Sequence, residues 1–272
     1  MSVARRFIWS VRRGSIRSDV KSHFRSWRQG PRRLAANAEL ANGTHSSVRV
    51  NRYACSVSSA TSYLEIGVEY GYTLEAVTLP RRVAVDPRPA FSLDSLPSGL
   101  TVFSTTSDMF FETLDEEITF DIIFLDGLHT YQQTYRDLMN SLLHVGRRSV
   151  IIIDDVVPSD YISSIPDPVA SIKERATHRE SDVRWHGDVF RIISVLRDHH
   201  PELQFRTIVG AGNEQTVLWK TDANLESVSI DEATLAEYSQ VSYAEVFANG
   251  VPGYFRRGSD EQILDDFTHS LN

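Results

Sequence analysis

The chain has 272 residues, of which 41% are hydrophobic and 24% are charged, and its net charge is −8. This length and composition predict a globular protein with one α/β domain and extensions. The single cysteine, Cys55, excludes an intramolecular disulfide and favours a reducing compartment. No apolar run approaches the roughly 18 residues needed to cross a bilayer, and no segment has the apolar core of a secretory signal. We therefore expect a cytoplasmic protein without a transmembrane segment.

Charge is distributed unevenly along the chain. Residues 1–33 carry ten lysines and arginines and a single acid, Asp19. Such a basic segment fits a transit peptide, a surface-binding arm or a solvated extension. Ile16, Val20 and Phe24 recur at helical spacing, so part of the segment is expected to form an amphipathic helix.

The two ends of the chain differ in charge, and neither has the pattern of an independent domain. We expect a basic, mainly helical leader over residues 1–61, a ligand-binding domain over 62–220 and an acidic, mainly helical extension over 221–272. Because opposite charges attract, these extensions predict a homodimer or a larger assembly. We do not expect nucleic acid as a partner.

Short apolar runs alternate with helical patterns from residue 62 onward. Strands are predicted over residues 62–67, 81–86, 100–104, 120–126 and 149–155. Helices are predicted after Gly71, over residues 107–114, after Thr130 and over residues 188–200. The last two runs, 203–210 and 213–220, are joined through Gly210 and Gly212 and predict a terminal strand pair.

The clearest helix follows Thr130. Thr130 and Gln133 have the spacing of a capping box, and Gly146 follows the end of the helix. One apolar stripe runs along it, made of Tyr131, Tyr135, Leu138, Met139 and Leu142. The two tyrosines are interpreted as core or as pocket wall. In the later helix, Asp188 is interpreted as the N-cap.

Alternating strand–helix units followed by an antiparallel pair indicate an α/β fold. The expected architecture is a doubly wound, seven-stranded Rossmann-like sheet whose last strand is antiparallel. In such sheets ligands bind at the carboxyl ends of the strands. The residues that end the predicted strands are therefore the candidates for function.

Three acids end two neighbouring strands of this sheet. Asp126 ends one strand, and Asp154 and Asp155 end the next. Clustered carboxylates repel one another unless a cation or a proton lies among them. N-capping could explain one of these acids, but hardly the adjacent pair together with Asp126. The pattern predicts a site for Mg²⁺ or for proton transfer.

The first strand leads into a glycine turn. Glu65, Gly67 and Gly71 precede the next helix, and Asp86 ends the second strand, where an acid commonly accepts the ribose hydroxyls of an adenosine cofactor. The third glycine of a dinucleotide fingerprint is absent, which weighs against an NAD-dependent oxidoreductase. A Rossmann-like binding module without catalysis is the other alternative.

Several segments together resemble the class I S-adenosylmethionine-dependent methyltransferases of type 24, which are related to O-methyltransferases of macrolide sugars and aminocoumarins. They are LEIGVEYGYT, AVDPRP, STTSDMFF, FDIIFLDGLHTYQQTYRDL, SVIIIDDVVP and WHGDVFRII. The resemblance covers residues 60–220 and implies a methyltransferase sheet.

The same resemblance implies roles for individual residues. Glu65, Gly67 and Gly71 would line the methionine and ribose portion of S-adenosylmethionine, and Asp86 would hold the ribose. Ser107 and Asp108 would lie beside the adenine. The metal-dependent relatives hold Mg²⁺ at the positions of Asp126, Asp154 and Asp155, and Asp126 would also face the cofactor. Glu69 stands where other members have a glycine.

The expected reaction is methyl transfer from the sulfonium of S-adenosylmethionine to a hydroxyl of a small molecule or glycoside. Mg²⁺ on the acids would lower the pKa of that hydroxyl. Asp126 and His129 are the candidate catalytic residues, with His129 as a general base. The alternative for His129 is a histidine that bonds backbone in front of a helix. Residues 40–60, 156–185 and 240–258 are expected to form the acceptor pocket.

Overall fold

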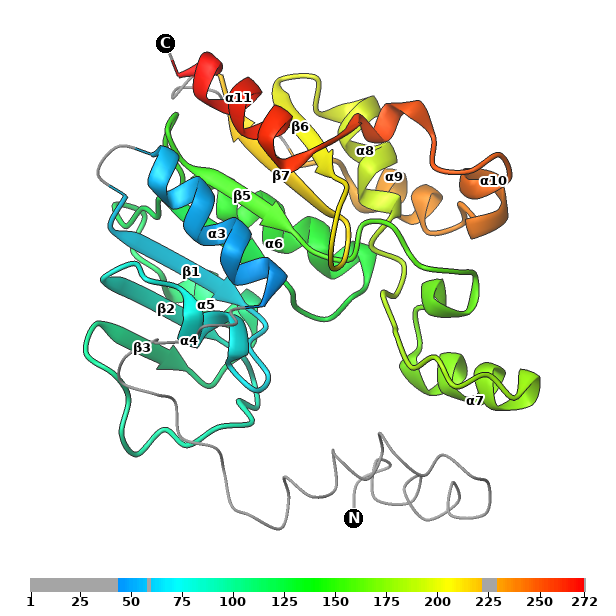
Figure 1. The fold of residues 1–272 in the computed structure, drawn as a ribbon, viewed down its shortest axis with the longest axis horizontal. Helices are drawn as coiled ribbons and strands as arrows, with labels where there is room; N and C mark the ends of the chain where they lie inside the picture. Colours follow the sequence, from blue (N-terminus) through cyan, green and yellow to red (C-terminus); the bar gives the residue numbers. More distant parts are fainter. Residues whose placement is uncertain (1–43, 58–59, 222–228, 272) are drawn as a thin grey trace. The chain divides into compact units, whose positions relative to one another are not determined.

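A computed structural model describes residues 44–57, 60–221 and 229–271 (Figure 1). The basic segment over residues 1–33 and its expected amphipathic helix lie outside the described residues. Among the residues described, no helix combines the length and the apolar character needed to cross a membrane.

The fold is built on one mixed sheet of eight strands in the order β3-β2-β1-β4-β5-β7-β6-β8. The strands are β1 Ser62–Ile66, β2 Arg81–Val85, β3 Leu100–Phe103, β4 Ile122–Leu125, β5 Val150–Ile153, β6 Leu203–Ile208, β7 Gln215–Lys220 and β8 Arg257–Gly258. β7 is antiparallel to both of its neighbours, β5 and β6. The predicted Rossmann-like fold class is confirmed. The eighth strand was not predicted, because its two residues are too short to show any periodicity.

Helices cover both faces of the sheet (Figure 1). They are α3 His45–Ser56, α4 Tyr72–Ala76, α5 Ser107–Thr113, α6 Tyr131–Leu143, α7 Pro168–His178, α8 Arg191–His199, α9 Glu232–Tyr238, α10 Tyr243–Phe247 and α11 Asp260–Ser270, with single 3₁₀ turns η2 Ile162–Ser164 and η3 Gly253–Phe255. The central strands are buried on both faces, which explains their continuous apolar runs.

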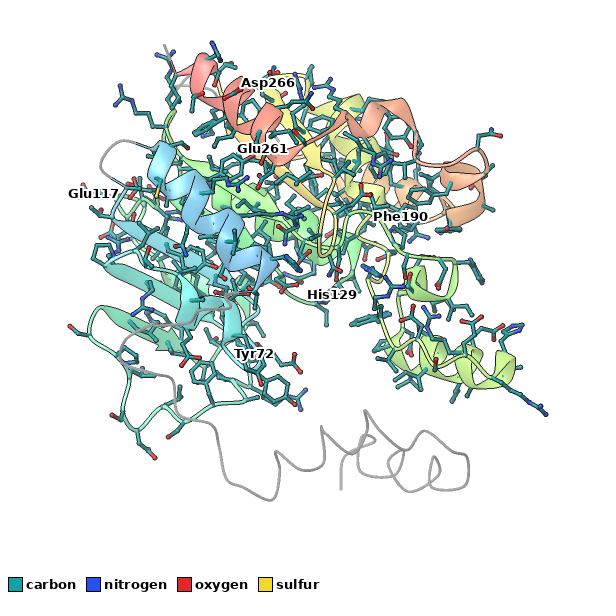
Figure 2. The ribbon with its side chains drawn as sticks, in the orientation of Figure 1. Tyr72, Glu117, His129, Phe190, Glu261 and Asp266 are labelled. Atoms are coloured by element: carbon teal, nitrogen blue, oxygen red, sulfur yellow. The ribbon has the colours of Figure 1, made fainter. Side chains whose placement is uncertain are left out.

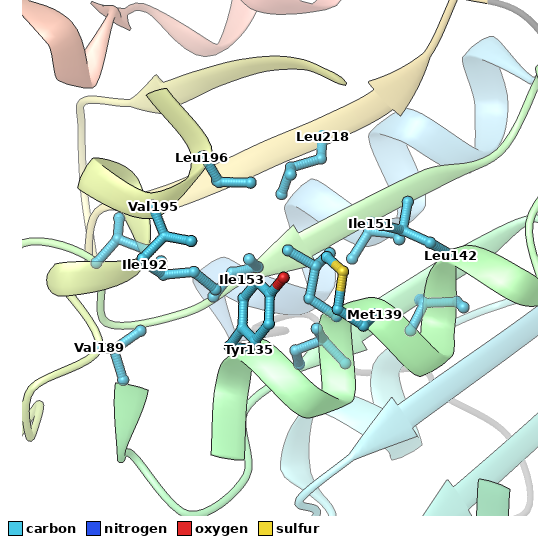
Figure 3. Close-up of a cluster of buried hydrophobic side chains, with 14 of the residues drawn as sticks. Tyr135, Met139, Leu142, Ile151, Ile153, Val189, Ile192, Val195, Leu196 and Leu218 are labelled. Carbon is cyan, nitrogen blue, oxygen red and sulfur yellow. The ribbon is translucent and has the colours of Figure 1, made fainter. Parts of the chain in front are cut away.

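Two hydrophobic cores lie on opposite faces of the sheet. Along β5, Ile151 and Ile153 belong to one core, whereas Val150 and Ile152 belong to the other. This alternation follows from the two-residue period of a strand. Figure 3 shows the first core, in which Tyr135 and Met139 of α6 pack beside β5 and α8.

The segments that flank the sheet in sequence contribute to these same cores. Val50 and Tyr53 of α3 pack in the second core with Phe267 of α11, and the rings of Tyr53 and Phe267 lie 6.1 Å apart. Leu235 of α9 and Val246 of α10 pack in the first core. Both described flanking segments therefore help to bury the sheet. The leader, domain and extension boundaries at residues 61 and 221 remain predictions.

The predicted apolar stripe of α6 is buried, but the predicted capping box is wrong. Thr130 is the N-cap residue, yet its side chain accepts no hydrogen bond from the helix. The Tyr131 N–H instead donates to Asp188 Oδ1 at 2.8 Å. Asp188 is therefore not the cap of α8, which begins at Arg191. A carboxylate outcompetes the threonine because its full negative charge also faces the positive end of the helix.

This arrangement predicts different effects for two alanine substitutions. Asp188→Ala leaves the Tyr131 N–H and the Arg191 guanidinium without their carboxylate partner. We expect it to lower the free energy of unfolding by roughly 1–3 kcal/mol. Thr130→Ala should change it by less than about 0.5 kcal/mol. Urea denaturation of both variants measures these changes. A larger loss of unfolding free energy in Thr130→Ala than in Asp188→Ala would show that the capping box forms after all.

Candidate functional site

The carboxyl ends of four neighbouring strands, β2, β1, β4 and β5, are joined by backbone hydrogen bonds. The Gly67 N–H donates to Val85 of β2, the Asp126 N–H donates to Ile66 of β1, and the Asp154 N–H donates to Leu125 of β4. Each of these residues directly follows its own strand. The first residues beyond β1, β4 and β5 are therefore fixed side by side at one edge of the sheet.

Gly67 is required by this close approach. Its φ is +83°, and a Cβ atom built on it would lie 2.0 Å from the Asp126 carbonyl oxygen. Any side chain would therefore push β1 and β4 apart. Gly71 also has a positive φ, 72°, and precedes α4. Glu69, between them, adopts a φ of 38°, which is uncommon for a residue with a side chain.

Asp86 organises the turn that follows β1. Its Oδ2 accepts the N–H groups of Val68 and Glu69, each at 3.0 Å, and its Oδ1 accepts the Arg88 N–H at 2.7 Å. A carboxylate offers about four lone pairs. One acceptor position on Oδ1 therefore remains for a ligand hydroxyl. The predicted acid is in place beside the glycine turn, and it has a structural role that the sequence pattern did not reveal.

Glu65 is buried beneath this turn. The Tyr63 hydroxyl donates to Glu65 Oε2 at 2.8 Å. Burial raises the pKa of the Glu65 carboxyl to about 8; the Tyr63 hydrogen bond opposes this change and the charge of Asp86 adds to it. A carboxyl that keeps its proton at neutral pH can donate a hydrogen bond as well as accept one.

The raised pKa of Glu65 predicts a pH dependence of stability. The carboxyl has an ordinary pKa of 4.5 and a folded-state pKa of about 8. Between these values the folded protein holds more protons, so its free energy of unfolding falls as pH rises. Glu65→Gln should remove this contribution. Between about pH 5 and about pH 9, its free energy of unfolding should fall by roughly 1–4 kcal/mol less than that of wild type.

Chemical denaturation at several pH values measures this difference. Glu112→Gln, an exposed substitution on α5, is the control and should follow wild type. If the free energies of unfolding of wild type and Glu65→Gln depend on pH in the same way, the pKa of Glu65 is not raised.

Ser107 and Asp108 lie in the first turn of α5, as predicted, and contact α6. The side-chain nitrogen of Gln133 lies 3.1 Å from Ser107 Oγ, 3.0 Å from Asp108 Oδ1 and 2.9 Å from Asp137 Oδ1. Burial raises the pKa of Asp137 to about 6, although hydrogen bonds from Ser107 and Gln133 lower it. The contacts that Gln133 and Asp137 make beside α5 were not predicted, because both residues lie within the helical pattern of α6.

The structure brings Asp126, His129 and Asp155 together at the same edge. One ligand atom from each side chain lies within 4.8 Å of the others. His129 Nδ1 lies 2.6 Å from Asp155 Oδ2, and His129 Nε2 lies 3.6 Å from Asp126 Oδ1. Figure 2 shows His129 below the end of β5.

Asp154 lies next to this cluster but not within it. Asp155 adopts a φ of 60° just beyond β5, and the Asp154 side chain is hydrogen-bonded by Gln215 of β7. Its Oδ1 also accepts the Asp155 N–H at 2.8 Å. The structure thus groups two of the three predicted metal ligands and adds His129 to them.

Burial and the closeness of several acids change the pKa values of the side chains in and beside this cluster. Burial, followed by the charges of Asp154 and Asp155, raises the pKa of Asp126 well above its ordinary value. Burial and the charge of Asp155 raise the pKa of Asp154 to about 7. For His129, burial lowers the pKa, but the hydrogen bond and charge of Asp155 outweigh it and raise the pKa. The site favours added positive charge, whether a proton or a cation.

The segment Trp185–Asp188 fixes the position of His129. The backbone N–H of Asp188 donates to the His129 carbonyl oxygen at 3.2 Å. A Cβ on Gly187 would lie 1.7 Å from that oxygen, so only glycine fits. The Trp185 and His129 ring centroids are 5.0 Å apart. These contacts hold His129 at a φ of 41°.

The same segment and the loop after β6 surround Asp155. His186 Nε2 lies 3.7 Å from Asp155 Oδ1, and the Asn213 side-chain amide donates to that oxygen. His186 is buried, and its Nδ1 has no hydrogen-bond partner among the residues that the structure describes. Sequence analysis missed the roles of His186, Gly187 and Asn213. A glycine between two polar residues ahead of a helix was the available signal.

Residues 64–156 match the Methyltransf_24 family, described as a methyltransferase domain. The cofactor-bound crystal structure of Rv0187 from MTB superposes with a TM-score of 0.51 at 15% identity, over 75% of this chain and 89% of that one. This likeness supports the fold. No curated protein matches the chain.

Two further structures are similar at lower scores. The O-methyltransferase TomG from Streptomyces achromogenes, in complex with SAM, has 16% identity and a TM-score of 0.47 over 69% of this chain and 82% of that one. An O-methyltransferase from Bacillus cereus, in complex with SAH, has 17% identity and a TM-score of 0.44, with coverages of 68% and 84%.

The family match favours methyl transfer over the NAD-dependent oxidoreductase and the non-catalytic module. It includes the glycine turn, Asp86 and the acids at the ends of β4 and β5. Residues 64–156 thus match a methyltransferase domain of the type 24 family, and this match supports S-adenosylmethionine-dependent methyl transfer by the chain.

Proposed function

We propose that this methyltransferase methylates a hydroxyl oxygen of a small molecule or glycoside, with His129 as the general base. One observation carries the proposal: the 2.6 Å contact between His129 Nδ1 and Asp155 Oδ2 at the edge that also holds the glycine turn. This pairing of imidazole and carboxylate is the arrangement that many enzymes use to accept a proton from a hydroxyl.

The cofactor site is proposed to lie over the turn between β1 and α4. Gly67 and Gly71 leave the backbone open to a ligand, and Asp86 retains an acceptor position for a ribose hydroxyl. Glu65 is buried in β1 two residues before Gly67, and its carboxyl accepts the Tyr63 hydroxyl. Ser107 and Asp108 are the first two residues of α5, the helix that follows β3, and this position supports their proposed place beside the adenine.

Binding of S-adenosylhomocysteine tests this cofactor site. Asp86→Ala removes a charged acceptor for the ribose and also the anchor of the Val68 and Glu69 N–H groups. We expect it to weaken binding by about 2–4 kcal/mol, which corresponds to about 30-fold or more. Isothermal titration calorimetry measures the affinity, and Glu237→Ala, an exposed change on α9, is the control. Unchanged affinity in Asp86→Ala would exclude this site.

The geometry assigns a direction to proton transfer. Because Nδ1 of His129 donates to Asp155, the lone pair is on Nε2, which faces Asp126. Nε2 would accept the hydroxyl proton as the oxygen attacks the methyl carbon. The carbon–sulfur bond would break in the same step as the new carbon–oxygen bond forms, and its electron pair would remain on sulfur as neutral S-adenosylhomocysteine. Asp155 stabilises the imidazolium that forms.

The side chains around His129 also support a particular kind of acceptor. Leu128 is 64% exposed beside Asp126, and the partly exposed Trp185 lies against the His129 ring. An apolar surface next to a base favours an acceptor that carries a hydroxyl on a ring with an apolar face. A sugar ring or a polyketide ring has this character.

A divalent cation is proposed as a second component of the site. The donor set fits one, because two carboxylates and an imidazole converge. Burial, and after it the crowding of negative charge, raises the pKa values of Asp126 and Asp154. Asp126 and Asp155 would hold Mg²⁺, with Asp154 or His129 as the third ligand. If His129 is the third ligand, the cation rather than His129 would activate the hydroxyl. The bound cation would lower the pKa of an acceptor hydroxyl.

Titration of Mg²⁺ into the protein with bound S-adenosylhomocysteine tests the cation. Asp126→Asn and Asp155→Asn should each abolish saturable binding, because each removes a charged oxygen ligand. Asp154→Asn distinguishes the two candidate sets. Loss of binding assigns Asp154 as the third ligand, and retention assigns His129. Absence of binding to the unaltered protein would reject the metal and leave His129 as the base.

A further inference from the structure

A buried arginine of α3 holds the loop between β6 and β7. The Arg49 guanidinium donates from Nη1 to the Asn213 carbonyl oxygen at 2.7 Å and from Nη2 to the Ala211 carbonyl oxygen at 2.9 Å. The arginine is only 4% exposed, so these hydrogen bonds compete little with water. Two donors of one rigid, planar group therefore fix the backbone of residues 211–213.

Two further contacts hold this loop against the first residues of α3. Gly212 has a φ of +82°, and a Cβ atom built on it would lie 2.7 Å from the Cβ of His45. At the start of β7, the Gln215 side-chain amide donates to Ser46 Oγ at 2.8 Å. The loop is thus fixed from the side of α3, although its own side chains are exposed.

Asn213 connects the loop to the proposed base. Its side-chain amide donates to Asp155 Oδ1 at 2.5 Å, whereas Asp155 Oδ2 lies 2.6 Å from His129 Nδ1. A carboxylate that is held at one oxygen cannot rotate freely, so Asn213 fixes the direction of the oxygen that His129 contacts. His186 Nε2, at 3.7 Å from Oδ1, is too far away to replace this hydrogen bond.

Packing alone does not explain an arginine at this position. Both acceptors of Arg49 are neutral backbone carbonyls rather than carboxylates. Burial lowers the pKa of Arg49, and the charges of Asp260 and Asp154 oppose this change. A buried charge is costly, and an apolar side chain of similar size could fill the same space at less cost. The guanidinium therefore has its main effect on the loop to which it donates.

We propose that Arg49 is a positioning residue for methyl transfer. It holds Asn213, which in turn orients Asp155 toward the His129 ring. This inference rests on the proposed function, in which His129 Nε2 accepts the hydroxyl proton while Nδ1 keeps its own. Once the loop is released, Asp155 can turn away from Nδ1. The neutral ring can then carry its proton on Nε2 instead, after exchange with water, and it no longer offers a lone pair there.

Nitrogen-15 NMR of the imidazole rings in the full chain tests this proposal, with a chelator present and at a pH where His129 is neutral. A His129→Gln variant identifies the signal among the nine histidines. Wild type should hold the proton on Nδ1. In Arg49→Met, the ratio of the Nδ1–H to the Nε2–H form should fall about tenfold, the factor that corresponds to one hydrogen bond. This variant should fold, because methionine fills most of the space and water can reach the exposed loop.

Two further variants separate this link from a general loosening of the protein. Asn213→Ala should lower the ratio as much as Arg49→Met does. The double variant should lower it no further, because both changes break the same chain of contacts. Arg49→Lys keeps the charge and can donate to one carbonyl, so its ratio should lie between those of wild type and Arg49→Met. If Arg49→Met does not fold, the ratio in Arg49→Lys decides the question.

Arg52→Gln is the matched control. Arg52 also extends from α3, but it pairs with Asp260 and Glu261 of α11, so its loss should leave the ring proton of His129 in place. An unchanged ratio in Arg49→Met, beside a wild type that holds the proton on Nδ1, would overturn this inference alone. Equal losses in Arg52→Gln and Arg49→Met would show a general effect of α3 and would also overturn it. A wild type with the proton on Nε2 would reject the proposed base and the inference together.

Discussion

The contact between the ends of β1 and β4 is the constraint on which the site depends. Gly67 lies so close to the Asp126 carbonyl oxygen that no side chain fits at residue 67. This proximity places the glycine turn, which we propose holds the cofactor, directly beside the acids that we propose activate the acceptor. Donor and acceptor must meet within bonding distance for methyl transfer. The backbone alone therefore supplies much of the alignment that the reaction needs.

The fold was predictable from the sequence because its signals are local. The apolar runs of β1, β4 and β5 and the stripe of α6 each reflect burial of a single element. The order of these elements along the chain is compatible with only a few topologies. The short strand β8 has no such signal, because it depends on its pairing with β6, about fifty positions earlier in the chain.

The candidate site was predictable only in part. Asp126 and Asp155 follow buried strands, and this position identifies them in the sequence. By contrast, His186 and Asn213 reach Asp155 through tertiary contacts that no spacing records. The same reason explains the error at α6. A helix cap supplied by Asp188, from 57 residues away, leaves the local Thr130–Gln133 pattern unused.

That distant cap has a consequence for the order in which the protein folds. The hydrogen bond between Tyr131 and Asp188 closes a loop that contains β5, η2 and α7. Closing a long loop is entropically costly, so such contacts form after the local elements that they connect. The backbone of His129 receives its own support from the same residue, Asp188. The proposed base thus reaches its final conformation only once this loop has closed.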